Sequence, residues 1–147
     1  SVSRMRAAVV KASTSGALDE GVVANAYAWI RKASEDGLDG MVVILQRVLQ
    51  LYAQSALPAE GGSPIAQLID KVVASDEEQW DALLREGLHG LGEQQAMDAD
   101  SFFKCLQSRM EKTVLDAGAG TFSQRVQAEY LKEIEDRASA VLKEKGQ

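Results

Sequence analysis

The sequence predicts an all-α protein, a compact bundle of five to six helices with no sheet. Apolar residues recur three and four positions apart through most of the chain, which is the spacing of one helical face. Capping residues and glycines separate these segments, and no segment alternates polar and apolar residues between hairpin turn dipeptides. No repeat of about 30–50 residues suggests a solenoid. The chain has 147 residues, so we expect a single helical domain over 18–147.

Residues 1–17 differ in composition from the rest of the chain. Their charged residues are all basic: Arg4, Arg6 and Lys11. The first carboxylate is Asp19, and removing the three cations leaves 13 basic and 22 acidic residues over 18–147, a net charge of −9. A basic, Ser/Ala-rich and acid-free start is typical of an organelle transit peptide, and residues 9–13 resemble the processing region of chloroplast precursors. We therefore expect a plastid transit peptide remnant and a location in the chloroplast stroma; the alternative is a disordered basic arm of a cytoplasmic protein.

The first predicted helix begins after Asp19, which can cap it, and runs to about Glu35. Gly37 supplies a left-handed stop, and Asp39 is expected to cap the next helix. That second helix, over 40–56, is apolar on most of its sides, so we expect it at the centre of the bundle. Its apolar residues are Met41, Val42, Val43, Ile44, Leu45, Val48, Leu49, Leu51 and Tyr52.

The third predicted helix follows a loop over 57–62, which is rich in glycine and contains a proline. Ser63 can cap this helix, and Pro64 occupies the first helical position, where its missing N–H is not needed. The apolar stripe of the helix comprises Ile65, Leu68, Ile69, Val72 and Val73. A short amphipathic helix is therefore expected directly after the loop.

Two more helices are predicted before residue 117. Ser75 and Glu78 have the spacing of a capping box, and the helix that they open is expected to fade in a glycine-rich stretch. Its glycines are Gly87, Gly90 and Gly92. Asp98 is expected to cap the fifth helix. The apolar residues of that helix are Phe102, Phe103, Leu106, Met110 and Val114.

The last predicted helix begins near Thr121, where Gln124 completes a second capping box, and runs to about residue 144. Its inner apolar stripe comprises Val126, Tyr130, Ile134, Ala138 and Val141. On its outer face Glu133 and Arg137 are four residues apart, which favours an ion pair between them.

Residues 113–121 resemble the first motif of class I S-adenosylmethionine methyltransferases, in which a short strand precedes Asp-x-Gly-x-Gly. The resemblance implies three cofactor contacts: Asp116, Gly118 and Gly120. It also implies that Asp136, about twenty residues later, binds the ribose. This sequence departs from the family pattern, because Phe122 stands in place of the third glycine and Asp136 lies in a charged helical segment. We therefore interpret the glycines as a turn between two helices, and we predict no cofactor.

Glu86 and His89 have the Glu-x-x-His spacing found in di-iron carboxylate bundles. A di-iron site within one chain needs a second such motif, and His89 is the only histidine, so we predict no metal site and no catalytic residue. Cys105, the only cysteine, is expected to be a small buried residue among apolar neighbours. A pocket between helices near Glu86 and His89, in a small-molecule-binding protein or an enzyme, is the alternative function.

The acidic composition, with a net charge of −6 over the whole chain, argues against a nucleic-acid-binding protein. No run approaches 18 apolar residues, so no transmembrane segment is expected. Trp29 lies off the apolar stripe of the first helix, where it can anchor an interface or be covered by the N-terminal arm or another helix. We therefore expect a non-catalytic protein-interaction module, either an assembly or adaptor factor or a small subunit of a complex in the plastid stroma.

Overall fold

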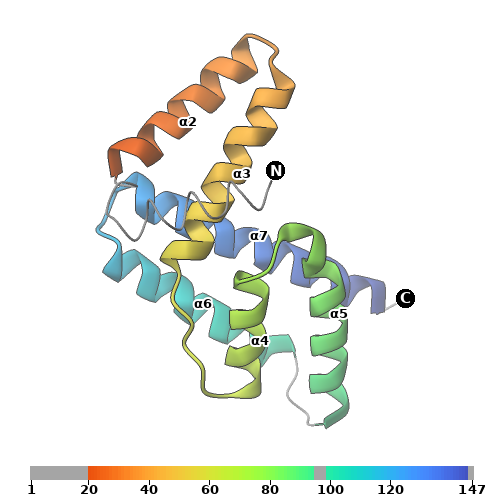
Figure 1. Cartoon of the computed structure of the whole chain (residues 1–147). Coiled ribbons are helices and arrows are strands. Elements are labelled where there is room, and N and C mark those ends of the chain that lie inside the picture. The colour runs from red at the N-terminus through yellow and green to blue at the C-terminus, as the bar shows by residue number, and fades with distance from the viewer. Residues whose placement is uncertain (1–19, 95–98, 146–147) are drawn as a thin grey trace. The chain divides into compact units, whose positions relative to one another are not determined.

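The computed structural model describes residues 20–94 and 99–145 (Figure 1). Within these residues the chain forms six helices and no strand, which confirms the predicted all-α fold. The helices are α2 (Glu20–Glu35), α3 (Asp39–Ala56), α4 (Pro64–Val73), α5 (Glu77–Gln94), α6 (Ala99–Asp116) and α7 (Phe122–Lys145). None of the helices in the described ranges combines the length and apolar character that a bilayer crossing requires. The predicted transit peptide over 1–17 and the caps Asp19 and Asp98 lie outside the described residues.

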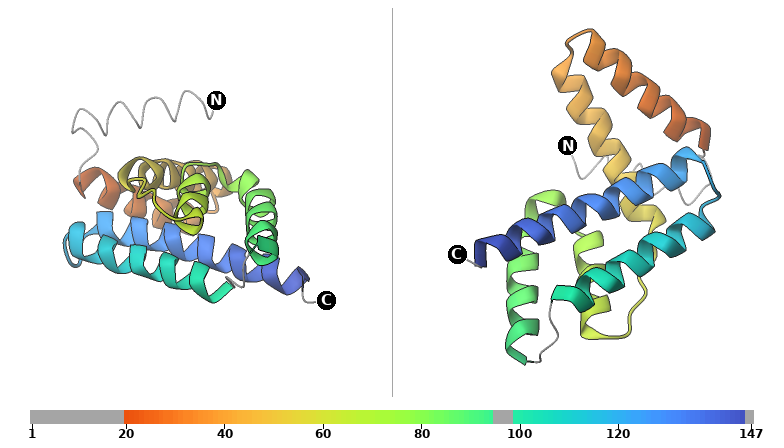
Figure 2. Two further views of the ribbon diagram at one scale, coloured as in Figure 1. Left: turned by 90° about the horizontal axis from the view of Figure 1, so that it is seen from below. Right: turned by 180° about the vertical axis from the view of Figure 1, so that it is seen from behind.

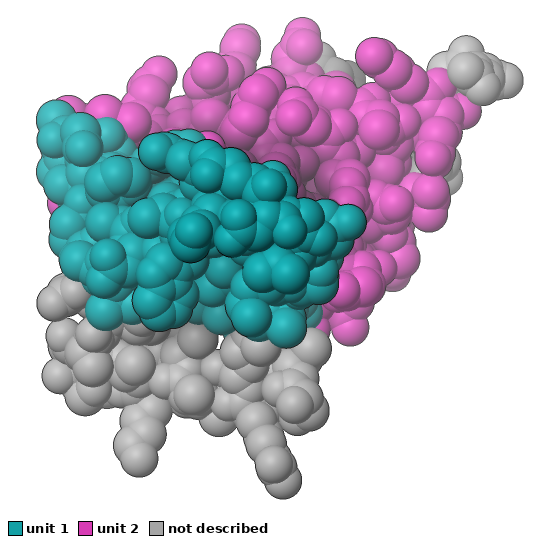
Figure 3. All heavy atoms as spheres, turned by 90° about the horizontal axis from the view of Figure 1, so that it is seen from above, with its two compact units in different colours: residues 1–57, 117–127 teal, residues 58–116, 128–147 magenta. Residues whose placement is uncertain are grey.

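The chain divides into two compact units (Figure 3). Unit 1 comprises the chain up to Leu57 together with 117–127, and unit 2 comprises 58–116 together with the chain from Ala128 onward. Helix α7 contributes its first residues to unit 1 and the rest to unit 2. In unit 1, α2 and α3 form an antiparallel hairpin, which Figure 2 shows from two further sides. The single domain expected over 18–147 stays a prediction.

Several predicted helix ends are present, with one correction. Gly37 has a φ of 73°, and the N–H of Leu38 donates to the carbonyl of Ala33, which closes α2 as predicted. The hydroxyl of Ser63 accepts from the N–H of Ala66, as expected of a cap. Asp39 does not cap α3, because Leu38 holds the cap position and makes no side-chain hydrogen bond there. Asp39 instead lies in the first turn of α3, where its charge complements the helix dipole.

Helix α5 does not fade at Gly87, as the glycine content predicted, but continues to Gln94. The side chain of Leu68 from α4 lies against Gly87, and a Cβ at this position would come within 2.5 Å of Leu68 Cδ1. The glycine therefore allows close approach of α4 and α5 within a continuous helix.

The core of unit 2 is an apolar cluster from α4, α5, α6 and α7. Trp80 is fully buried and meets the ring of Tyr130 edge to face, with the ring centroids 5.3 Å apart. The hydroxyl of Tyr130 donates to the carbonyl of Val73, and the indole N–H of Trp80 donates to that of Ser75. The predicted inner stripe of α7 is buried at all five positions, which confirms that assignment.

Arg109 of α6 is a buried cation, with 5% of its surface exposed. Its Nη1 lies 2.7 Å from Asp70 Oδ1, and its Nη2 donates to the carbonyl of Ala66. Its Nε lies 3.4 Å from the carboxylate of Glu60, an ion pair without a hydrogen bond. The carboxylate of Asp70 also accepts from the backbone N–H groups of Glu60 and Gly61. We call these groups the Arg109 clamp; they tie the loop before α4 to α4 and α6.

The clamp lowers the pKa of Asp70 below its ordinary value of 3.8. Burial acts in the opposite direction, but the hydrogen bonds from Glu60, Gly61 and Arg109 outweigh it. Because the folded-state pKa is depressed, the contribution of Asp70 to stability is complete above its unfolded pKa. That contribution is lost as the pH falls through the folded-state pKa.

Arg137 of α7 has other partners than the predicted ion pair with Glu133. Its guanidinium forms ion pairs with Glu77 and Asp81 of α5, and it lies 5.6 Å from the ring centroid of Trp80. Burial raises the pKa of Glu133, and the negative charge of Glu77 adds to this effect, although Arg137 opposes it. The sequence showed the four-residue spacing between Glu133 and Arg137, but it could not show that α5 brings two other carboxylates to Arg137.

We expect Arg109→Met to lower the free energy of unfolding by about 3 kcal/mol, because it leaves the carboxylate of Asp70 without its cation. The measurement is urea unfolding at neutral pH, followed by circular dichroism. Arg85→Met is the matched control, since it removes an exposed ion pair with Glu144 at 3.0 Å and should lower the free energy of unfolding much less than Arg109→Met does. Equal losses in the two variants would contradict the clamp.

Asp70→Asn should flatten the decline in the free energy of unfolding as the pH falls below 3.8, because the substitution removes the carboxylate whose pKa is lowered in the folded state.

Glu133→Gln is expected to raise the melting temperature at pH 7. A carboxyl group with a raised folded-state pKa stabilises the fold only below its ordinary value of 4.5, and this contribution is lost as the pH rises. The benefit of the substitution should therefore disappear when the pH falls below 4.5. Glu111→Gln removes an exposed carboxylate from α6 and should leave the melting temperature unchanged at both pH values.

Candidate interaction surface

The α2–α3 hairpin has its own small apolar core. Helical spacing brings Val23 and Ala26 of α2 to the side that meets Leu49 and Tyr52 of α3, and Val126 at the start of α7 joins them. These five residues are each at least 91% buried. Tyr27, Ile30 and Ala56 pack around this cluster and are partly buried. The outer residues of the hairpin are therefore carried by two helices that pack tightly against each other.

One side of the hairpin is covered by the start of α7. The ring of Tyr27 meets Phe122 with the centroids 5.6 Å apart, and the guanidinium of Arg125 lies 4.3 Å from the centroid of Tyr27. The hydroxyl of Tyr52 lies 2.6 Å from that of Ser123. The carboxylate of Glu20 accepts from the backbone N–H groups of Phe122 and Ser123, so it caps α7 from another helix. These contacts fix the first turn of α2 against the first turn of α7.

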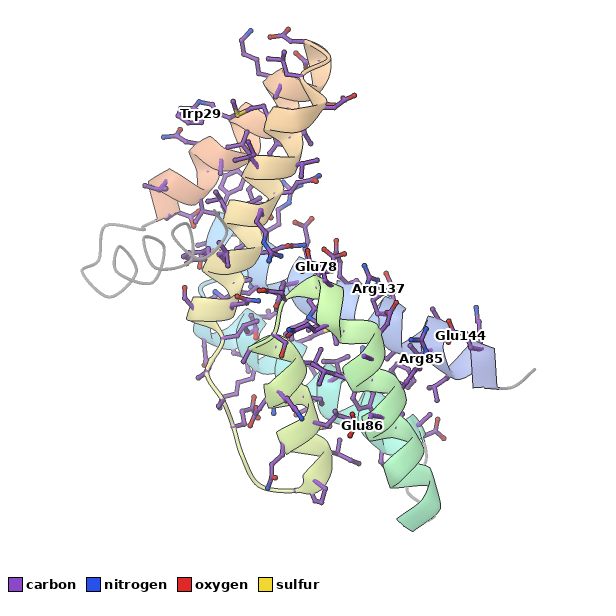
Figure 4. The ribbon with its side chains drawn as sticks, turned by 45° about the vertical axis from the view of Figure 1, so that its right-hand side comes forward. Trp29, Glu78, Arg85, Glu86, Arg137 and Glu144 are labelled. Carbon is purple, nitrogen blue, oxygen red and sulfur yellow. The ribbon has the colours of Figure 1, made fainter. Side chains whose placement is uncertain are left out.

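The opposite side of the hairpin is apolar and exposed. Trp29 follows Tyr27 by two positions, which turns it about 200° around α2 and away from the contacts with α7. Figure 4 shows the Trp29 side chain projecting outward from α2. Val22 lies on the same side of α2, seven positions earlier, and Met41 and Ile44 in the first half of α3 are exposed as well. We call Val22, Trp29, Met41 and Ile44 the Trp29 face.

The side chains of the Trp29 face have large exposed fractions. The exposed fractions are 41% for Val22, 63% for Trp29, 48% for Met41 and 49% for Ile44. Leu38 and Val43 add further exposed apolar surface around the end of the hairpin. Several large exposed apolar side chains on one helical hairpin indicate an interaction site more strongly than one such residue does.

The exposure of α3 corrects the expectation that this helix lies at the centre of a bundle. Its second half fits the expectation, since Leu49, Tyr52 and Ala53 are buried. Its first half does not, because Met41 and Ile44 remain exposed. The apolar composition of α3 therefore predicted burial correctly only for the part of the helix that another helix covers.

The other residues considered from the sequence do not form a site among the described side chains. Glu86 lies on α5 (Figure 4) and is exposed, and the side chain of His89 lies outside the described part of the structure. No group of three or more potential metal ligands occurs within the part of the chain that the structure describes. Cys105 is half-buried rather than buried.

The segment that resembles a methyltransferase motif is helical where that family has a strand. Asp116 is the last residue of α6, and Gly118 and Gly120 follow with φ values of 87° and 79°. The hydroxyl of Thr121 accepts from the N–H of Gln124, and the Gln124 side chain reaches back to the N–H of Gly120. Asp136 lies on α7, 3.1 Å from Lys132. The glycines thus provide the predicted turn.

The sequence indicated Trp29 as a candidate interface residue, but it did not indicate the exposed apolar residues of α3. The position of Trp29 off the apolar stripe left two outcomes open, exposure or cover by another segment, and in the structure the side chain is 63% exposed. Met41 and Ile44 were grouped with the core because their helix is apolar on most of its sides. The sequence did contain a sign of this exposed surface, because α3 has more apolar positions than one facing helix can cover.

Comparisons with protein-family models, with curated proteins and with solved structures found no match.

Proposed function

We propose that this protein is a non-catalytic protein-interaction module and that the Trp29 face is its binding surface. The observation that carries the proposal is the 63% exposure of a tryptophan within a larger apolar patch. Tryptophan is enriched among the residues that dominate binding energy at protein interfaces. The exposed faces of Met41 and Ile44 supply apolar surface around this anchor.

The support beneath the Trp29 face favours binding. The buried cluster of the hairpin and the contacts of Tyr27, Tyr52 and Glu20 with the start of α7 hold α2 and α3 in place. A preorganised surface loses less conformational entropy when a partner docks. The partner suited to this surface is an apolar face of another protein, such as one side of an amphipathic helix.

The location of this activity is proposed from composition alone. The basic, acid-free residues 1–17 support the plastid stroma, where the protein would serve as an assembly or adaptor factor or as a small subunit. Import of a fluorescent protein fused behind residues 1–19 into isolated chloroplasts tests this location. The alternative of a small-molecule site near Glu86 and His89 gains no support, because Glu86 is exposed.

We expect Trp29→Ala to weaken partner binding by at least about 2 kcal/mol, roughly a thirtyfold rise in Kd. The stability of the protein should change by less than about 0.5 kcal/mol, since the side chain is largely exposed. Leu115→Ala is the matched control, because Leu115 is 82% exposed and lies outside the Trp29 face. The partner is first identified by photo-crosslinking from a benzophenone side chain at position 29. Its binding to each variant is then measured by calorimetry with the purified partner.

The crosslinking step identifies the partner by its position on the surface. A benzophenone at position 29 should capture one stoichiometric protein from a stromal extract, and a benzophenone at position 115 should not. Equal capture at both positions, or equal loss of binding in Trp29→Ala and Leu115→Ala, would overturn the proposed surface.

A further inference from the structure

We draw no further inference here: the strongest candidate, the exposed apolar surface around Trp29 on the α2–α3 hairpin, belongs to the binding surface already described, and nothing among the described residues shows what covers it.

Discussion

Helix α3 has more apolar sides than the described helices of its unit cover, and the proposed binding surface follows from that imbalance. The side toward α2 is buried at Leu49 and Tyr52, and Ala53 is fully buried. The first half of the helix keeps Met41 and Ile44 about half exposed. Burying such a side chain contributes about 1.5–3 kcal/mol, so this uncovered surface represents binding energy that a docking segment can use. Docking of a protein partner, as proposed above, would cover this apolar surface.

The opposite side of the hairpin gives this surface its rigidity. Tyr27 and Tyr52 contact the first turn of α7, and Glu20 caps that turn with its carboxylate. A helix capped by a side chain from another helix joins two distant parts of the sequence at one point. These contacts hold the two helices that carry the Trp29 face against the start of α7.

Buried and half-buried charges have a structural role in unit 2. Arg109 holds the loop before α4 through Asp70 and Glu60, and Arg137 joins α7 to α5 over the ring of Trp80. Both arginines neutralise carboxylates of their own unit, and neither is part of the Trp29 face. The pKa of Glu133, by contrast, is raised, because the partial desolvation of its carboxylate and the negative charge of Glu77 outweigh the attraction of Arg137.

The sequence by itself determined the helices and most of their ends, whereas it left open whether Trp29 is exposed or covered. Ser63, Thr121 and Gly37 act through hydrogen bonds and backbone preferences within a few residues, so their effects can be predicted locally. The tertiary structure decided which side of α3 is covered, how Gly87 fits within α5 and which partners Arg109 and Arg137 have. Each of these depends on which distant helix approaches, and a local pattern of apolar and charged residues carries no information about the neighbour it will meet.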